Sequence, residues 1–526
     1  MRLALLVCET SEDGLGEAAT QRGCDLGKVT RWPCGTTPAR WRACPSRLAG
    51  LAVGLLATFG LGSMTAPAAE REPSGPNILL ILSDDHSVPH IGCYHNPDIR
   101  TPNLDRFAAQ GMRFDRTYVT APQCVPSRAT IMTGRSPVRI GMTRFSAPLP
   151  QDVVTYPELL RAHGYFTGVA GRDYHLDGMA NEPDLKAVFD KHGLRTFAGR
   201  LDYVKKTEDR AETLAQLREF LDAVPAGKPF FLQLGYRDPH RPFDQGAIPE
   251  PHDPARLTLP TFFPDTPAVR ADFARYYDEI ARFDRCVGEV LAELERRGLI
   301  GSTLIAVMGD NGAALLRGKG TLYEFGLRVP LLVRWSGVLK AGSSTDALIS
   351  GEDIAPTFLE AAGVTPPKEM TGRSFLKLLR GEPYTDRPYV FAERGAHAAA
   401  LPTDTAQFDL SRCVVSKRFK LIYNALWQLP YTPVDFYGDD FWLELRQMNA
   451  QGRLAPQLAR LYFTPTRPMF ELYDLQKDPS EMENLAGQAA MEVVEDELKS
   501  ALYEWMLLER DYVPLPIPDV PRAKRK

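Results

Sequence analysis

The sequence predicts an α/β fold with a mostly parallel β-sheet sandwiched by helices, and three observations support this class. Short apolar runs recur over residues 76–385 without the alternation of half-exposed strands, so both faces of each strand should be covered. Helical patterns, such as the one over residues 272–298, separate these runs. After residue 386, the segment "SRCVVSKRFKLIYNA" does alternate, which predicts a smaller C-terminal α+β subdomain with an antiparallel sheet.

Four of the apolar runs end abruptly in polar side chains of catalytic type. A single run of this kind is more simply explained as a strand followed by a solvated turn, whereas four together favour a site. In an open parallel sheet, ligands collect beyond the carboxyl ends of the strands, so the four ends should share one cleft. The polar residues at these ends are, in chain order, Asp84 with Asp85, Arg172 with His175, His240, and Asp310 with Asn311.

The first and the last of these ends have the chemistry of a hard-cation site. They offer only oxygen ligands, from Asp84, Asp85, Asp310 and Asn311. Three of these ligands are anionic, which favours Ca²⁺ or Mg²⁺ over zinc. Adjacent aspartates on a regular strand point to opposite faces, so Asp84 and Asp85 can bind one ion only if the strand has already ended. The following "HSVPHIG" is consistent with such an ending.

Cys124 precedes a proline-initiated turn in "TAPQCVPSRATIMTGR". Pro126 can occupy the first turn of a helix, where its missing N–H costs nothing, so "SRATIMTG" should continue that helix. Cys124 would then lie at the positive end of the helix dipole, one turn from Arg128. An activated thiolate is the direct functional interpretation. However, no thiol-hydrolase signature surrounds the cysteine, and a carboxylate-rich metal site is a poor companion for a cysteine nucleophile.

The stretch "CVPSRATIMTGR" resembles the signature of the type I sulfatases, C-x-P-S-R followed by T-G-R. The resemblance extends from "PNILLILSDDH" to "FELYDLQKDPSEMENLAG", which is nearly the whole chain after its N-terminal extension. It implies an alkaline-phosphatase-like fold, sulfatase activity and conversion of Cys124 to formylglycine, whose hydrate is the nucleophile in that family. It also implies a maturation partner, either a formylglycine-generating enzyme or an anaerobic sulfatase-maturating enzyme.

The resemblance also assigns roles residue by residue. It implies that one cation, Ca²⁺ or Mg²⁺, is bound by Asp84, Asp85, Asp310, Asn311 and the modified Cys124. Arg128 would hold the aldehyde hydrate, and His175 would take the proton that lets the sulfated hydrate collapse. His240 and Lys319 would grip the sulfate and protonate the leaving group. Where many members have "GKWHLG", this chain has "GRDYHLDG", with Arg172 in place of lysine, so the part of that residue in orienting the hydrate is open.

The substrate class follows from stretches outside these motifs. Residues 257–300, together with "FKLIYNALWQLPYTPVDFY" and "FELYDLQKDPSEMENLA", resemble the heparan N-sulfatase (sulfamidase) branch. This implies release of sulfate from N-sulfoglucosamine in heparan or heparin fragments. His397 falls where that branch has histidine-bearing substrate contacts. Three alternatives stay open: an O-sulfatase acting on another sulfated polysaccharide, a phosphonate or phosphate monoester hydrolase of the same superfamily, and a carbohydrate-binding protein with an inactive site.

Charge and the N-terminal segment limit partners and location. The formal net charge of -4 is spread along the chain, which argues against nucleic acid as the partner.

Residues 1–69 are interpreted as an extension and a secretory signal, because a short apolar run precedes "APA". The protein is therefore expected to be exported, periplasmic or secreted, without stable membrane insertion after cleavage; a membrane anchor is the alternative. A catalytic domain over 76–385 and a C-terminal subdomain over 386–526 should follow. Whether the protein forms a homodimer is left open by the sequence.

Overall fold

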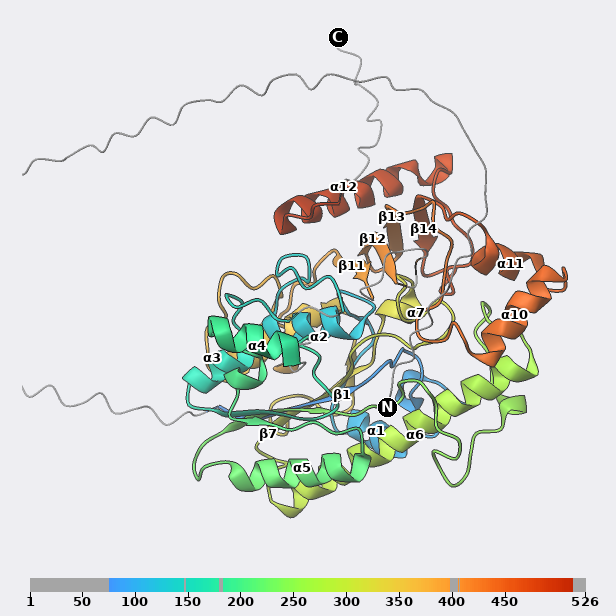
Figure 1. Ribbon diagram of the computed structural model, residues 1–526. Helices are drawn as coiled ribbons and strands as arrows, with labels where there is room; N and C mark the ends of the chain where they lie inside the picture. The colour runs from blue at the N-terminus through green and yellow to red at the C-terminus, as the bar shows by residue number, and fades with distance from the viewer. Residues whose placement is uncertain (1–74, 146–147, 179–182, 398–404, 406, 514–526) are drawn as a thin grey trace, which may run out of the picture. The chain divides into compact units, whose positions relative to one another are not determined.

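The main β-sheet of the computed structural model has eight strands and is mostly parallel. Figure 1 shows two of them, β1 and β7, in the layer between the helices. The structure describes residues 75–145, 148–178, 183–397, 405 and 407–513. The extension and signal predicted over residues 1–69 lie outside these ranges. In spatial order the strands are β5 (Tyr203–Val204), β4 (Phe166–Gly171), β6 (Phe230–Gly235), β1 (Asn77–Ser83), β7 (Thr303–Gly309), β8 (Leu331–Arg334), β2 (Met112–Phe114) and β9 (Ser343–Thr345). Strand β8 runs antiparallel to its neighbours β7 and β2, and the other pairs are parallel.

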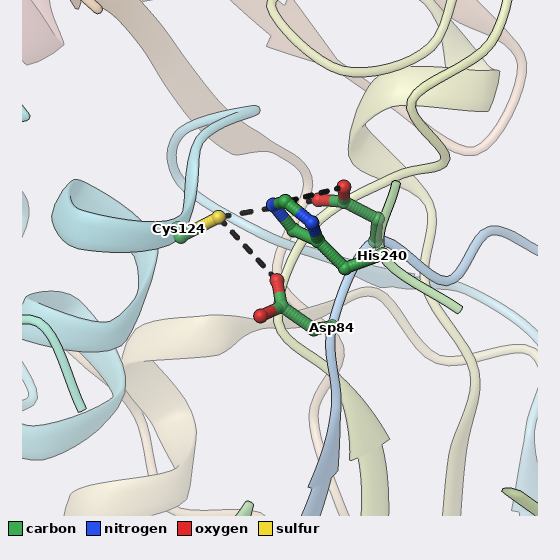
Figure 2. Close-up of side chains that lie close together, drawn as sticks. Asp84, Cys124 and His240 are labelled. Carbon is green, nitrogen blue, oxygen red and sulfur yellow. Dashed lines mark hydrogen bonds and ion pairs between the residues drawn. The ribbon is translucent and has the colours of Figure 1, made fainter. Parts of the chain in front are cut away.

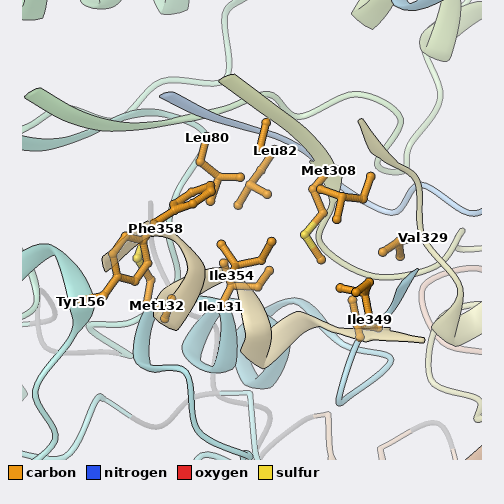
Figure 3. Close-up of a cluster of buried hydrophobic side chains, with 14 of the residues drawn as sticks. Leu80, Leu82, Ile131, Met132, Tyr156, Met308, Val329, Ile349, Ile354 and Phe358 are labelled. Atoms are coloured by element: carbon orange, nitrogen blue, oxygen red, sulfur yellow. The ribbon is translucent and has the colours of Figure 1, made fainter. Parts of the chain in front are cut away.

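Helices cover both faces of this sheet, which explains why the strands lack alternation. In β1, Leu79 and Ile81 pack into one buried cluster, whereas Leu80 and Leu82 pack into another on the opposite face (Figure 3). The first cluster includes side chains of α1 (Pro102–Ala109), α5 (Arg210–Ala223) and α6 (Pro267–Arg296). The second includes side chains of α2 (Cys124–Thr133), α3 (Tyr156–Ala162) and α8 (Ile354–Ala361), and α4 (Pro183–His192) lies on the same side of the sheet (Figure 1). The predicted α/β class is confirmed.

A second sheet of four antiparallel strands follows in the C-terminal part of the chain, as the alternating segment predicted. Its strands, in order, are β11 (Val390–Ala396), β12 (Phe408–Val415), β13 (Phe419–Asn424) and β14 (Phe470–Asp474). Helix α12 (Glu492–Glu509) packs on this sheet, with Leu498 and Leu502 in one buried cluster with Val414 and Leu421 (Figure 1).

The connection between β13 and β14 ties the second sheet to the main one. It contains α10 (Asp440–Ala450) and α11 (Pro456–Phe463). Trp442 of α10 and Tyr462 of α11 share a buried aromatic cluster with Phe273 of α6. The loops that join these elements are therefore held against the helix layer of the main sheet.

The remaining elements are short. They are the parallel pair β3 (Thr117–Tyr118) and β10 (Ile349–Ser350), the helices α7 (Glu324–Leu327) and α9 (Leu376–Leu379), and the 3-10 turns Gly92–Tyr94, Ala198–Arg200, Pro254–Arg256, Gly351–Asp353 and Ala489–Met491. Among the described residues, the structure contains no helix with the length and apolar character needed to cross a membrane.

Candidate active site

The carboxyl ends of β1 and β7 bring the predicted acidic residues together. The register pairs Ser83 with Gly309, so Asp84 and Asp310 follow at the same level of the sheet. The backbone N–H of Asp310 donates to the carbonyl of Ser83 at 3.0 Å, and the N–H of Asp85 donates to Asp310 Oδ1 at 3.0 Å. Strand β1 ends at Ser83 and Asp85 has φ 66°, which confirms that the strand ends before the aspartate pair.

Cys124 is the first residue of α2, and its sulfur points toward Asp84 (Figure 2). Pro126 lies in the first turn of the helix, as the sequence predicts, and the helix ends at Gly134, whose φ of 64° suits glycine. The Cys124 side chain is buried, and its Sγ lies 3.5 Å from Asp84 Oδ1 and 3.9 Å from Asp85 Oδ1. The cysteine is therefore directed at the carboxylate cluster rather than at solvent.

The surroundings of Cys124 do not favour a thiolate. Burial raises the pKa of the thiol well above its usual value; Lys319 acts to lower it, but the carboxylates of Asp84 and Asp310 act to raise it further. A thiol nucleophile needs the opposite electrostatics, a nearby positive charge that outweighs burial. The interpretation of Cys124 as an activated thiolate therefore loses support.

Two arginines bind the carboxylates from either side. Arg128, one turn along α2, places its Nε 2.8 Å from Asp310 Oδ2 and its Nη2 3.5 Å from Asp84 Oδ2. Arg172 follows β4 and places its Nε 2.7 Å from Asp84 Oδ2. The arginine that replaces the expected lysine thus contacts the cluster directly. Asp84 is shared by both guanidinium groups.

The three buried aspartates differ in proton affinity. Burial, together with the neighbouring carboxylates, raises the pKa values of Asp85 and Asp310 to about 7. Burial also acts to raise the pKa of Asp84, but electrostatic interactions with His240, Arg128 and Arg172 outweigh it and hold that pKa well below its usual value.

His240 and Lys319 form a pair beside the cluster. Lys319 is buried, and its Nζ lies 3.0 Å from Asp85 Oδ2 and 3.2 Å from His240 Nε2. His240 Nδ1 lies 2.5 Å from the carbonyl of Arg241, so Nδ1 carries the proton and donates. Burial and the Lys319 charge lower the pKa of His240. Nε2 therefore faces the site as the atom that can gain and lose a proton.

His175 is another predicted strand-end residue, and the charges of Arg128, Asp84 and Arg172 act on it. It follows Arg172 on the loop after β4, has φ 58° and lines a cavity of about 190 Å³ with Val125, Phe145 and Lys206. Its Nε2 is buried and has no hydrogen-bond partner among the described residues. Burial, reinforced by the Arg128 charge, lowers its pKa to about 3, so the imidazole is neutral.

The donor set fits a divalent cation, with two differences from the predicted ligands. Ligand atoms of Asp84, Asp85, Cys124 and His240 all lie within 4.8 Å of one another. Asn311 Oδ1 is buried with no hydrogen-bond partner among the described residues, as expected of an oxygen left for a metal. By contrast, Asp310 lies outside this group: its Oδ1 accepts from two backbone N–H groups and its Oδ2 from Arg128. His240 lies inside the group, although the resemblance implied another role.

Sequence reasoning missed Asp435, a residue of the loop between β13 and α10. Its Oδ2 lies 2.7 Å from Lys319 Nζ, and its Oδ1 lies 3.3 Å from His397 Nε2. His397 directly follows β11, and its Nδ1 lies 3.1 Å from the side-chain amide of Gln123, the residue before α2. His397 thus lies beside Gln123 and Asp435, and its predicted contact with substrate stays a prediction. In the sequence, Asp435 lies within "FKLIYNALWQLPYTPVDFY", a stretch that resembles the sulfamidase branch, but that resemblance assigned no role to the aspartate.

A second missed residue supports the turn that carries His240. The backbone carbonyl of Asp238 accepts from the N–H of Asp84 at 3.1 Å. Its buried carboxylate is bound by Arg282, with contacts of 2.8 Å to both oxygens, and by Arg210. Asp238 thus joins the β6 turn to β1 and to helices α5 and α6.

Two family models match the chain. The first, described as Sulfatase, matches residues 76–364. The second, described as N-sulphoglucosamine sulphohydrolase, C-terminal, matches residues 315–429. The second match spans the loop that bears Lys319 and the strand that precedes His397.

Individual proteins are similar over most of the chain. N-sulphoglucosamine sulphohydrolase of Homo sapiens is 30% identical over 478 residues, covering 82% of this chain and 89% of the human protein. An ulvan-active sulfatase of Formosa agariphila is 29% identical over 469 residues, covering 84% and 77%. A protein solved in complex with its substrate D-glucosamine-2-N,6-O-disulfate has a similar fold, with a TM-score of 0.62 and 21% identity over 84% of this chain and 99% of that chain. The predicted alkaline-phosphatase-like fold is confirmed.

Proposed function

This chain belongs to the sulfatase family and is a sulfate ester hydrolase, and we propose that it releases sulfate from N-sulfoglucosamine in heparan or heparin fragments. The observation that carries the substrate class is the similarity to the human N-sulphoglucosamine sulphohydrolase. The match of residues 315–429 to the C-terminal model of that name points to the same substrate class. That match lies outside the cysteine motif, in the part of the chain that bears Lys319 and His397.

Cys124 is proposed to be converted to formylglycine by a formylglycine-generating or an anaerobic sulfatase-maturating enzyme. Once formed, the aldehyde hydrate supplies an oxygen nucleophile for sulfur. The raised thiol pKa supports this proposal, because the unmodified side chain is a poor nucleophile where it lies. The position at the start of α2, against Asp84 and Asp85, suits an oxygen that a cation polarises.

The proposed cation is Ca²⁺ or Mg²⁺, held by Asp84, Asp85, Asn311 and the modified Cys124. Asp310 is a further ligand that the family resemblance predicts. When bound, it offsets negative charge on the sulfate and on the nucleophile. Asp310 contributes at least by orienting Arg128 and the backbone of Asp85, whichever ligands complete the cation site.

Arg128 is proposed to hold the hydrate and the sulfate oxygens. Its two terminal nitrogens are buried and have no hydrogen bond among the described residues, although Nη2 lies 3.5 Å from Asp84. A buried guanidinium with unsatisfied donors is costly unless an anion completes it, so these donors are suited to a sulfate. Arg172 is proposed to keep Asp84 ionised and in place.

His240 and Lys319 are proposed to bind the sulfate and deliver the proton to the leaving group. An incoming anion favours protonation of His240 at Nε2, because it offsets the lowering effect of the Lys319 charge. His175, neutral and with a free Nε2, is proposed as the base that later takes a proton. His397 is proposed to contact the sugar.

The test is sulfate release from defined sugars by the matured protein. Glucosamine N-sulfate should yield inorganic sulfate, and the 6-O- and 2-O-sulfated counterparts should react more slowly. Release from only the O-sulfated sugars would contradict the N-sulfatase assignment and leave the sulfatase mechanism standing. That outcome would favour the second candidate, an O-sulfatase acting on another polysaccharide, which the similarity to the ulvan-active sulfatase supports.

We further propose that the protein is exported through the signal within residues 1–69. Determination of the N-terminal residue of protein recovered from the periplasm or the medium should place the new terminus near Ala68 or Ala69. Full-length protein retained in the cytoplasm would contradict this proposal. A homodimer stays a prediction.

A further inference from the structure

Asp435 introduces a negative charge into a site that must accept an anion. Its carboxylate contacts Lys319 Nζ at 2.7 Å and lies 3.9 Å from His240 Nε2, the two groups assigned to the sulfate. A carboxylate here repels an incoming sulfate, so a site that needed only to bind sulfate would be better without it. This cost requires a compensating contact with another part of the substrate.

We propose that Asp435 recognises the N–H group of the sulfamate and thereby selects N-sulfated over O-sulfated sugars. The proposal rests on the proposed function, because it names the group that distinguishes the substrate there. A sulfamate carries a hydrogen on the atom that bridges sugar and sulfur, whereas a sulfate ester presents only oxygen lone pairs at that position. A carboxylate accepts a hydrogen bond from the first and repels the second.

The geometry places Asp435 on the leaving-group side of the site. The bridging atom must come within hydrogen-bond reach of His240 Nε2 to receive its proton. Because Asp435 Oδ2 lies 3.9 Å from that nitrogen, one atom can contact both groups. The Asp435 side chain is 26% exposed whereas Lys319 is 1% exposed, so Asp435 lies toward the solvent side from which a sugar enters.

Asp435 also has the acceptor capacity for this contact. Its Oδ2 accepts from Lys319 and its Oδ1 from His397, which is held in turn by Gln123. Each carboxylate oxygen has two acceptor positions, so a substrate N–H can be bound without displacing either partner. Because His397 Nδ1 accepts from Gln123, its Nε2 donates to Asp435, and this chain of contacts fixes the carboxylate from the side of α2.

The chemical step balances with Asp435 as an acceptor only. The N–S bond breaks, the nitrogen keeps the bonding electron pair and takes one proton from His240, and the sulfuryl group passes to the nucleophile oxygen, whose own proton is lost to solvent. The amine formed gains a second N–H in this step and a third on protonation by water. Each new N–H strengthens the contact with the carboxylate, so Asp435 stabilises the departing amine more than the intact substrate.

The test compares Asp435→Asn with the wild type on glucosamine N-sulfate and on 4-nitrophenyl sulfate, whose bridging atom is oxygen. We expect the ratio of kcat/KM for the N-sulfate to kcat/KM for the aryl sulfate to fall about 10- to 100-fold, as for loss of one charge-assisted hydrogen bond. Asp440→Asn, the same change at the exposed start of α10, should leave this ratio within about twofold. An unchanged ratio in Asp435→Asn, with both activities lowered equally, would overturn the proposal and leave Asp435 a purely structural partner of Lys319.

A second measurement needs no variant. Glucosamine should inhibit the wild-type enzyme at least about tenfold more strongly than glucose does at neutral pH, since its ammonium group would pair with Asp435. Equal inhibition by the two sugars would contradict the proposal. A wild type that cleaves O-sulfates but not glucosamine N-sulfate would instead refute the substrate assignment on which the proposal rests.

Discussion

The carboxyl ends of the parallel sheet and the loops of the C-terminal sheet contribute different kinds of residue to one site. Asp84, Cys124 and Lys319 are 0–1% exposed, and hydrogen bonds between neighbouring strand ends fix the first of them. Asp435 and His397 come from the second region, and their side chains are 26% and 14% exposed. The fold thus fixes the groups proposed to react in its interior, while the groups proposed to contact the sugar lie on loops whose sequence can change without disturbing the sheet.

The largest effect should come from the reacting region. Replacing Cys124 with alanine should lower kcat for sulfate release by roughly 1,000-fold or more, because the nucleophile is lost. The fold should persist, as judged by thermal unfolding. Cys93→Ala, which removes a partly buried free thiol elsewhere, should retain activity. Substantial turnover by Cys124→Ala would contradict the claim that the nucleophile derives from Cys124.

Removal of the cation should have the next largest effect. Strong chelation should abolish most activity, because the clustered carboxylates then lack the positive charge that offsets their repulsion. Addition of Ca²⁺ or Mg²⁺ should restore it, and the ion that restores more identifies the preferred metal. Full activity in protein shown by elemental analysis to be metal-free would rule out the proposed cation site.

Substitution of Asp238 tests how much its buried carboxylate stabilises the protein and the turn that carries His240. Asp238→Asn should destabilise the protein by about 3 kcal/mol, since two arginines lose a buried partner, and should also lower kcat through the His240 turn. Asp244→Asn is the matched control, because Asp244 pairs with the same arginines but is 40% exposed. It should cost less than about 1 kcal/mol in urea unfolding. Equal costs for the two variants would contradict the role of Asp238.

The smallest effect on activity is expected at the C-terminal sheet, where the prediction concerns the pH dependence of stability. Burial raises the pKa of Glu393 on β11 to about 7, despite the neighbouring Arg412. The folded state therefore binds this proton more tightly than the unfolded state does. The contribution to stability is greatest below about pH 4.5 and declines up to pH 7, by at most about 1.4 kcal/mol per pH unit. Glu393→Gln should flatten this part of the stability–pH curve measured by urea unfolding; an unchanged slope would contradict the assignment.

Sequence reasoning reached the strand-end residues because their signal is local. An apolar run that stops at an aspartate pair reveals both the strand and its end, as at Ser83 and Asp84. The helix start at Cys124 was likewise readable from Pro126. The contacts of Asp310 with Arg128 and with the backbone N–H of Asp85 were not readable, because they depend on how α2, β1 and β7 pack together; its predicted role as a metal ligand stays a prediction.

Asp435 and Asp238 were missed for a different reason. Asp435 meets Lys319 only because α10 and α11 pack on α6 and carry their loop to the site. Asp238 acts through arginines of two helices far along the chain. Nothing in the composition around either residue reports a partner so distant in sequence, so contacts of this kind become visible only once the elements are packed.

The central claim is that the nucleophile derives from Cys124, and the most direct test is the mass of the peptide over residues 117–128 from active enzyme. The peptide contains "QCVPSR" and should be lighter than its encoded thiol form, in proportion to the specific activity of each preparation. Fully active enzyme in which this peptide carries only the unmodified thiol would contradict the account.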